Sequence, residues 1–313
     1  MKTIMNKQKK KQSLLCVIED YLWHCKIEKC LDEKTLKAYE FDLQQFLETV
    51  GDEDVDCLTK EQIRDYLKIM SRFSFKTRKR KLASLKAMLN YYECENDGFV
   101  NPLRRMQIQM REPIRLPTVM TINEVKAMLI TVRERRKACK SGSFSFMMAT
   151  RDIAVVELLF ATGMRVSELC DLRMSDVDIV QGRIRIIGKG NKERLVDICQ
   201  DETLKALKEW LSLYENKTSD SPLFISRLYR KLSPQSVRQL VKNLVEGVGM
   251  VKHVTPHTFR HTLATLLLEE DVDITYIQKL LGHSSIVTTQ IYTHVNLHKQ
   301  REILKSKHPR RLI

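Results

Sequence analysis

The sequence lacks an apolar run long enough to cross a membrane. Its longest apolar stretch, Ile153–Met164, contains Glu157 and falls well short of the roughly 20 residues that a transmembrane helix needs. The basic amino-terminal segment is followed by only a short apolar segment, with no small-residue cleavage site of the kind that ends a secretory signal. We therefore expect a cytoplasmic globular protein with no membrane partner.

The chain also lacks paired cysteines. None of its eight cysteines forms a C-x-x-C pair, and their spacing matches no zinc motif. Most of them fall within apolar helical patterns, and structural disulfides are rare in a reducing compartment. We expect free thiols that are buried and pack as small hydrophobic side chains. A P-loop, an internal repeat and a low-complexity tract are absent from the sequence as well.

Positive charge is abundant. The 313 residues contain 54 Lys and Arg against 39 Asp and Glu, which gives a formal net charge of +15. Such an excess indicates an anionic partner, and nucleic acid is a better candidate than an acidic membrane surface. A solvated helix face explains a single basic run equally well. Because the whole chain also carries a large positive charge, we favour phosphate contact for one such run. Its residues are Lys76, Arg78, Lys79, Arg80, Lys81 and Lys86.

Prolines mark a division of the chain near residues 111–120. Pro113 and Pro117 each bias the preceding residue toward extended backbone, so we expect no helix to cross this segment. We predict two domains, over residues 1–112 and 118–313. Helical spacing dominates the first, at residues 14–23, 35–50, 59–71 and 76–93, with Thr35 placed to cap the second helix. Helices without strands predict a small helical bundle.

The second domain adds a small sheet to a series of helices. Thr121 and Glu124 form a capping-box pattern that predicts a helix start. Alternating residues at 183–187 and 193–198 flank the glycine-containing turn Gly188–Lys192, which is typical of a β-hairpin. Further helices are predicted at residues 151–161, 168–172, 202–214, 233–248, 256–269, 274–281 and 285–292. The sequence therefore predicts a mainly α fold with a small antiparallel β-sheet.

Seven of the eight histidines lie in the last 61 residues, from position 253 onward. The spacing of His253, His257 and His261 first suggests a metal site on one helix face. However, Thr255 followed by Pro256 predicts that a helix begins there, so His253 precedes the helix and points elsewhere. No Asp or Glu is placed to complete a site, and we expect no metal.

The same helix start suits a phosphate. His257 and Arg260 lie three residues apart near the helix amino terminus, which adds positive potential. An arginine can grip two phosphate oxygens at once, and a histidine can exchange a proton near neutral pH. Upstream, Arg165 follows a glycine break and precedes Glu168, which is able to orient it. Taken singly, each of these residues also fits an ordinary surface or packing role.

Their order along the chain carries more weight than any one of them. The segments that contain Arg165, Lys189, His257-x-x-Arg260, His283 and Tyr292 resemble the ordered motifs of the tyrosine recombinase (phage integrase) family. The Gly-Lys-Gly turn is similar to the hairpin that carries the family's catalytic lysine, which makes Lys189 a closer match than Lys192. Residues 35–43 resemble the family's helical core-binding domain, and the likeness covers nearly the whole chain.

The resemblance implies a helical core-binding domain and a mixed α/β catalytic domain that form a clamp on double-stranded DNA. It implies that Tyr292 attacks a backbone phosphate and forms a 3′-phosphotyrosyl intermediate. Because that ester stores the bond energy, no cofactor or small-molecule substrate is expected. A phenol with a pKa near 10 is only about 0.1% ionised at pH 7, so its neighbours must assist. The resemblance implies six catalytic residues: Arg165, Lys189, His257, Arg260, His283 and Tyr292. It also implies that Glu168 orients Arg165.

Two alternatives share much of this pattern. A type IB topoisomerase uses a similar site, but the short helical front domain and the closer motif match favour a recombinase. A DNA-binding regulator on the same fold would not need Tyr292. Within the recombinases, residues 292–295 and 308–311 resemble the tail of Xer proteins, whereas the segment from Thr121 to Arg151 looks longer than in typical Xer proteins. A mobile-element integrase therefore stays open.

Assembly is implied by the resemblance alone. The family acts as a homo- or hetero-tetramer that brings two DNA duplexes together. The segment after Tyr292, residues 294–312, has apolar side chains available to pack on a neighbouring subunit. The target sequence and the partner recombinase do not follow from the residues.

Overall fold

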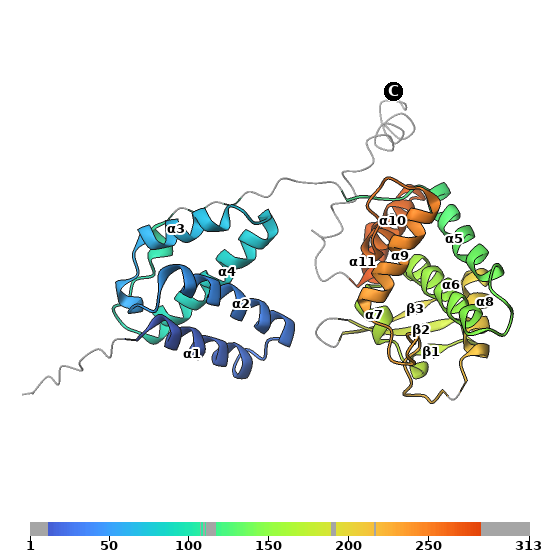
Figure 1. Ribbon diagram of the computed structural model, residues 1–313, viewed down its shortest axis with the longest axis horizontal. Coiled ribbons are helices and arrows are strands. Elements are labelled where there is room, and N and C mark those ends of the chain that lie inside the picture. The colour runs from blue at the N-terminus through green and yellow to red at the C-terminus, as the bar shows by residue number, and fades with distance from the viewer. Residues whose placement is uncertain are drawn as a thin grey trace, which may run out of the picture. The chain divides into compact units, whose positions relative to one another are not determined.

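The computed structural model describes residues 12–106, 108, 110, 117–188, 192–215 and 217–282. The chain forms two compact units, Met1–Ile114 and Arg115–Ile313 (Figure 1). Among the described residues, no helix is both long enough and apolar enough to cross a bilayer.

The described residues of unit 1 form a bundle of four helices with two short 3-10 turns. The helices are α1 (Leu14–Ile27), α2 (Glu33–Val50), α3 (Lys60–Met70) and α4 (Phe75–Glu95), and the turns are Val55–Cys57 and Pro102–Arg105. All four predicted helices are present. The predicted cap of α2 is wrong, because the helix begins at Glu33 and its N-cap is Asp32. The Asp32 carboxylate accepts the backbone N–H of Thr35 at 3.0 Å, so Thr35 lies inside the first turn.

The core of unit 1 contains buried side chains from all four helices. Phe46 is fully buried and meets the ring of Tyr66 edge-on, with 5.0 Å between the ring centroids. Beside these rings lies a buried ion pair, in which Lys81 Nζ is 2.8 Å from Asp42 Oδ1. Arg80 forms a second ion pair with the same carboxylate. The start of α4 is thereby fixed to α2 by charge as well as by apolar packing.

Unit 2 contains seven helices and a three-stranded antiparallel sheet among its described residues. The sheet order is β1-β2-β3, and Ile186 of β2 pairs with Arg194 of β3. The predicted hairpin is present, whereas β1 was not predicted because two residues are too few for an alternating pattern. The elements are α5 (Ile122–Lys137), α6 (Phe144–Thr162), α7 (Val166–Asp171), β1 (Val177–Asp178), β2 (Arg183–Ile187), β3 (Glu193–Asp197), α8 (Asp201–Leu213), α9 (Pro234–Val248), α10 (Pro256–Glu269) and α11 (Ile274–Leu281).

Helix α6 is the central helix of unit 2, and α5, α8 and α10 pack around it (Figure 1). Its second half is almost wholly apolar, and Ala154, Val156 and Leu159 are fully buried. The helix ends at Thr162 and is capped by Gly163, which has a φ of +56°, a conformation that glycine adopts at little cost. The chain then turns directly into α7, and this turn brings Arg165 to the surface.

The cysteines correct one expectation. Cys25 and Cys170 are buried free thiols, as predicted, but five others are exposed: Cys16, Cys30, Cys57, Cys94 and Cys199. An apolar helical pattern locates a helix, but it does not say which face a small residue within it occupies. The exposed cysteines lie on the solvent side or beyond the ends of their helices. The predicted helix over residues 285–292 lies outside the described residues.

Candidate active site

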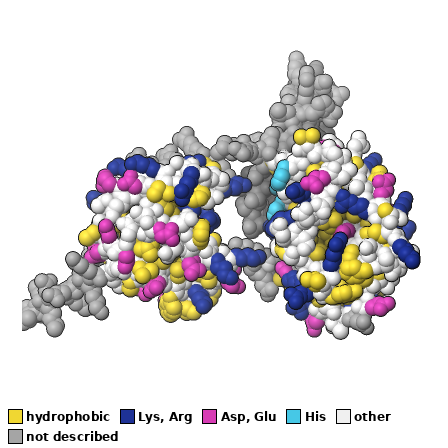
Figure 2. All heavy atoms as spheres, in the orientation of Figure 1, with side chains coloured by type: hydrophobic (Ala, Val, Ile, Leu, Met, Phe, Trp, Pro, Cys, Tyr) yellow, Lys and Arg dark blue, Asp and Glu magenta, His cyan; other side chains and the backbone are white. Residues whose placement is uncertain are grey.

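Of the seven residues predicted for the catalytic site, four lie among the described residues, and all four belong to unit 2. Arg165 comes from the turn between α6 and α7, Glu168 from α7 itself, and His257 and Arg260 from the first turns of α10. Lys189, His283 and Tyr292 lie outside the described residues. Figure 2 shows the histidines of this face gathered at the edge of unit 2 that carries α10 and α11 in Figure 1.

Glu168 orients Arg165 by two hydrogen bonds. Its Oε1 accepts from Arg165 Nη1 at 2.7 Å, and its Oε2 accepts from the Arg165 backbone N–H at 2.9 Å. The carboxylate is buried, whereas a third of the Arg165 side chain is exposed. The guanidinium is therefore fixed from behind and open in front, an arrangement suited to an anionic ligand.

A second arginine, which the sequence did not single out, grips the same carboxylate. Arg194 of β3 places Nη2 at 2.7 Å from Glu168 Oε2 and Nη1 at 3.2 Å from Oε1. Burial alone would raise the pKa of Glu168, but hydrogen bonds from Arg194 and Arg165 hold it below its ordinary value. The signal in the sequence was strand alternation, because Arg194 shares its face with buried Val196 while Leu195 points outward.

Arg260 is the most enclosed arginine of the site, with 3% of its surface exposed. Its Nη1 donates to the carbonyl of Gly163 at 2.9 Å and its Nη2 to that of Leu281 at 2.6 Å. A Cβ at Gly163 would come within 2.7 Å of a Leu281 methyl group, so α6, α10 and α11 pack closely around this side chain. The guanidinium is thus held at the meeting point of three helices.

The end of α11 is where the arginines converge. Three consecutive carbonyls accept from three different guanidinium groups: Leu280 from Arg194 Nε at 3.2 Å, Leu281 from Arg260 Nη2 at 2.6 Å and Gly282 from Arg165 Nη2 at 3.4 Å. A helix carboxyl terminus carries partial negative charge, which favours cations there. The site therefore holds the chain in place one residue before His283.

His257 lies one turn from Arg260 on α10 and reaches solvent. Partial desolvation, with added repulsion from Arg260, Arg165 and Arg238, holds the pKa of His257 below its ordinary value. Its neutral imidazole can therefore accept a proton at pH 7. Burial, with added repulsion from His257 and Arg260, lowers the pKa of His261 to about 4. Among the described residues, no three His, Cys, Asp or Glu side chains are grouped as a metal ion would require.

The side chains of the predicted phosphate-contacting run in unit 1 point in different directions from α4, so they differ in exposure. The side chains of Lys76, Lys79 and Lys86 are exposed, and those of Arg78 and Arg80 are half-buried. Lys81 departs from the prediction, because it is 1% exposed and its ammonium is paired with Asp42. The sequence could not reveal this, since the run is basic on every face of α4 and only the packing of α2 selects the one lysine that turns inward.

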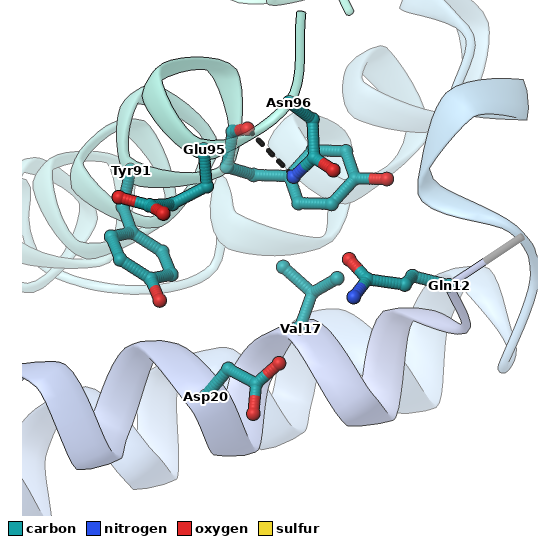
Figure 3. A pocket seen from close by; sticks show the side chains of 7 residues that line it. Gln12, Val17, Asp20, Tyr91, Glu95 and Asn96 are labelled. Atoms are coloured by element: carbon teal, nitrogen blue, oxygen red, sulfur yellow. Dashed lines mark hydrogen bonds between the residues drawn. The ribbon is translucent and has the colours of Figure 1, made fainter. Parts of the chain in front are cut away.

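A pocket of about 240 Å³ between α1 and α4 of unit 1 is unsuited to a phosphate (Figure 3). Its lining includes the carboxylates of Asp20 and Glu95 and the ring of Tyr91. Figure 3 shows Asp20 on one helix opposite Tyr91 and Glu95 on the other. Negative charge on both walls would repel an anion, so the pocket is separate in character from the arginine cluster of unit 2.

Comparison with known families covers both units. A profile of the phage integrase family matches residues 119–299. A second profile, the phage integrase N-terminal SAM-like domain, matches residues 18–96. The two matches fall within units 2 and 1, respectively.

Curated relatives match along nearly their whole length. A tyrosine recombinase of Agathobacter rectalis is 44% identical over 296 residues, which cover 94% of this chain and 96% of that protein. Tyrosine recombinase XerC of Thermodesulfovibrio yellowstonii is 35% identical, with 93% and 96% covered. Tyrosine recombinase XerD of Staphylococcus saprophyticus is 33% identical, with 94% and 99% covered.

Solved structures share the fold. XerA recombinase is 28% identical to this chain and superposes with a TM-score of 0.52. The match covers 95% of this chain and 99% of the XerA chain. XerH recombinase, solved in a post-cleavage complex with a palindromic difH substrate, is 22% identical, with 93% and 85% covered and a TM-score of 0.72. Together with the mostly helical units and the small sheet, these matches confirm the predicted fold class.

Proposed function

The chain belongs to the phage integrase family and is a site-specific tyrosine recombinase, and we propose that it cleaves DNA by attack of Tyr292 on a backbone phosphate bound by Arg165 and Arg260. The observation that carries this assignment of residues is the convergence of these two guanidinium groups beside the end of α11. Lys189, His283 and Tyr292 enter by their positions in the family's ordered motifs.

The arginines neutralise the negative charge that makes a phosphodiester slow to react. The anionic oxygens of a phosphodiester repel nucleophiles, and negative charge accumulates in the transition state. Fixed guanidinium groups lower this barrier because they are oriented before the reaction begins. Arg165 is oriented by Glu168, and Arg260 by the carbonyls of Gly163 and Leu281. His283 supplies a further hydrogen bond to the phosphate.

Proton transfer is divided between two groups. As the phenolic oxygen of Tyr292 forms its bond to phosphorus, its proton passes to the neutral imidazole of His257. The bond from phosphorus to the 5′ oxygen breaks, and Lys189 donates a proton to that oxygen. The products are a 3′-phosphotyrosyl ester and a 5′-hydroxyl strand end. Attack by another 5′-hydroxyl on the ester reverses these steps and joins the exchanged strands without an external energy source.

Each unit has its own part on the DNA. We assign unit 1 to core binding, with Lys76, Lys79 and Lys86 as phosphate contacts, and unit 2 to catalysis, the two clasping one duplex. A neighbour of the same fold, lambda integrase, has been solved as a tetramer on a Holliday junction. We propose that this chain likewise assembles as a tetramer on double-stranded DNA in the cytoplasm.

The names of the relatives favour an Xer-like role over mobile-element integration. Relatives named XerC and XerD each match at least 93% of this chain. Xer-like action predicts a fixed chromosomal site that is rejoined without net insertion. Recombination assays with a plasmid-borne copy of the bound site, read by sequencing both junctions, distinguish this outcome from integration of a mobile segment.

Covalent trapping tests the chemistry. The full-length protein first selects its site from a library of random duplexes, and copies of that site are then nicked at successive positions so that the short 5′-hydroxyl fragment diffuses away. The wild type is expected to accumulate a covalent protein–DNA adduct and Tyr292→Phe to form none. Tyr276→Phe is the matched control, because Tyr276 is an exposed tyrosine of α11. An adduct formed equally by Tyr292→Phe would overturn the assignment.

A further inference from the structure

We infer that Arg194 is a positioning residue for DNA cleavage, because it joins the carboxylate that orients Arg165 to the end of α11. This inference rests on the proposed function. Its basis is a set of three contacts made by one guanidinium group: two to Glu168 and one to the carbonyl of Leu280. Neither the motif order nor the charge pattern of the sequence pointed to this residue.

The two contacts to Glu168 restrict its carboxylate. Each carboxylate oxygen accepts one hydrogen bond from Arg194 and one from Arg165. Without Arg194, the Glu168 carboxylate would be held from one side only and could rotate about its terminal bond. The Arg165 guanidinium would then lose the fixed orientation on which its contact with a phosphate depends.

The third contact extends the linkage to another element. Arg194 Nε donates to the Leu280 carbonyl at 3.2 Å, and His283 follows Leu280 by three residues in the sequence. Arg194 itself belongs to β3, which continues from the hairpin turn that carries Lys189. A single side chain thus joins β3 to the Glu168 carboxylate of α7 and to the end of α11.

The surroundings of Arg194 suit a guanidinium and restrict its movement. Its side chain is 13% exposed, and it pairs across the sheet with fully buried Ile186. Gly282, at a φ of +65°, lies directly against it, and a Cβ there would stand 3.1 Å from Nη1 and 3.2 Å from Cδ. Only a planar fork with donors on three nitrogens can reach both Glu168 oxygens and the carbonyl, so a lysine replaces it incompletely.

The test compares Arg194→Ala and Arg194→Lys with Arg183→Ala. Arg183 is the matched control, because it forms an exposed ion pair with Asp197 on the same sheet. Thermal unfolding checks the fold of each variant, and equilibrium binding to the selected duplex is measured beside single-turnover cleavage of the nicked duplex. Arg194→Ala is expected to lower the cleavage rate by about 10- to 100-fold with nearly unchanged DNA affinity. Arg194→Lys is expected to fall between it and the wild type, and Arg183→Ala to cleave normally.

A modified substrate separates positioning from a general loss of structure. Replacing one nonbridging oxygen of the scissile phosphate by a methyl group removes the charge that Arg165 would stabilise. If Arg194 acts through Arg165, the defect of Arg194→Ala shrinks several-fold on this substrate. A defect of equal size on both substrates, accompanied by loss of DNA affinity or by a lowered melting temperature, would overturn the inference in favour of a structural role.

The remaining outcomes distinguish this inference from the proposed function. If the wild type forms the adduct and Arg194→Ala cleaves at the same rate, the positioning role fails and the proposed function stands. If the folded wild type forms no adduct on any nicked duplex, the proposed function fails and takes the positioning role with it.

Discussion

Each unit buries a carboxylate beside two cationic side chains, and the units differ in how completely the more enclosed cation is shielded from solvent. In unit 1, the side chains of Asp42 and Lys81 are 0% and 1% exposed. In unit 2, the Glu168 side chain is 4% exposed, and its partners Arg194 and Arg165 are 13% and 33% exposed. We call Asp42 and Lys81 the closed cluster, next to which the Arg80 side chain is 39% exposed, and we call Glu168, Arg165 and Arg194 the open cluster.

The difference separates a structural use of charge from a functional one. In the closed cluster, Lys81 also donates to Gln45 Oε1 at 2.5 Å and lies 5.2 Å and 5.3 Å from the ring centroids of Phe41 and Phe73. Its ammonium group is enclosed by protein, so it can serve only to join helices. In the open cluster, the carboxylate holds a guanidinium group whose outer face remains available to an anion.

The largest effect is expected from opening the closed cluster. Asp42→Ala leaves two cations without their shared carboxylate and should destabilise unit 1 by about 3–5 kcal/mol. Circular dichroism in urea should show an earlier transition. The fluorescence of buried Trp210, read in a Trp23→Phe background, should report an unchanged transition of unit 2. Lys37→Ala is the control, because its ion pair with Glu33 is exposed. If Asp42→Ala unfolds like the control, the closed cluster contributes nothing to stability.

A smaller effect is expected from titrating the histidines beside the open cluster. The pKa of His261 is about 4 in the folded protein against an ordinary 6.5, so the unfolded chain binds more protons between these values. The stability of unit 2 should therefore be full above pH 6.5 and fall as the pH drops toward 4, by at most about 1.4 kcal/mol per pH unit for one histidine. His261→Gln should flatten this dependence in urea unfolding followed by Trp210 fluorescence. An unchanged slope in the variant would refute the assignment.

The next effect is on cleavage and compares the two carboxylates directly. Glu168→Gln replaces one acceptor oxygen by an amide that faces two guanidinium groups, so it should slow cleavage of the nicked duplex by about 10- to 100-fold. Asp42→Asn makes the same chemical change in the closed cluster. It should lower the stability of unit 1 while leaving the cleavage rate per folded molecule unchanged. Equal cleavage defects in the two variants would erase the distinction between the clusters.

The sequence predicted the parts of the open cluster that depend on local order. Helix α10 starts at Pro256 and α11 ends at Leu281 as expected, because Thr255 with Pro256 and Gly282 are local signals that need no tertiary context. Arg165 and Glu168 are three residues apart, so their contact also follows from one helical turn. These local features were sufficient to bring out the family's motif order.

What the sequence did not predict depends on packing between distant segments. The contact of Arg194 with Glu168 joins residues 26 positions apart and exists only once β3 lies beside α7. The burial of Lys81 depends on Asp42, 39 positions earlier. In both cases the residue type was visible, but the partner that decides its role was contributed by another element.

The smallest effect is expected from the exposed lysines of α4. Comparing them with buried Lys81 tests whether the closed cluster stays closed when DNA binds. Each lysine that neutralises one DNA phosphate should steepen the dependence of log affinity on log salt by about 0.9. Lys76→Gln and Lys79→Gln should each reduce the slope by about that amount in binding titrations from 50 to 200 mM salt, at nearly unchanged stability. Lys81→Met removes the same charge from the same run but should leave the slope unchanged, because its ammonium group is paired with Asp42 within the protein. A slope reduced equally by all three substitutions would mean that Lys81 leaves its partner to bind DNA, and the closed cluster would then be closed only in the absence of DNA.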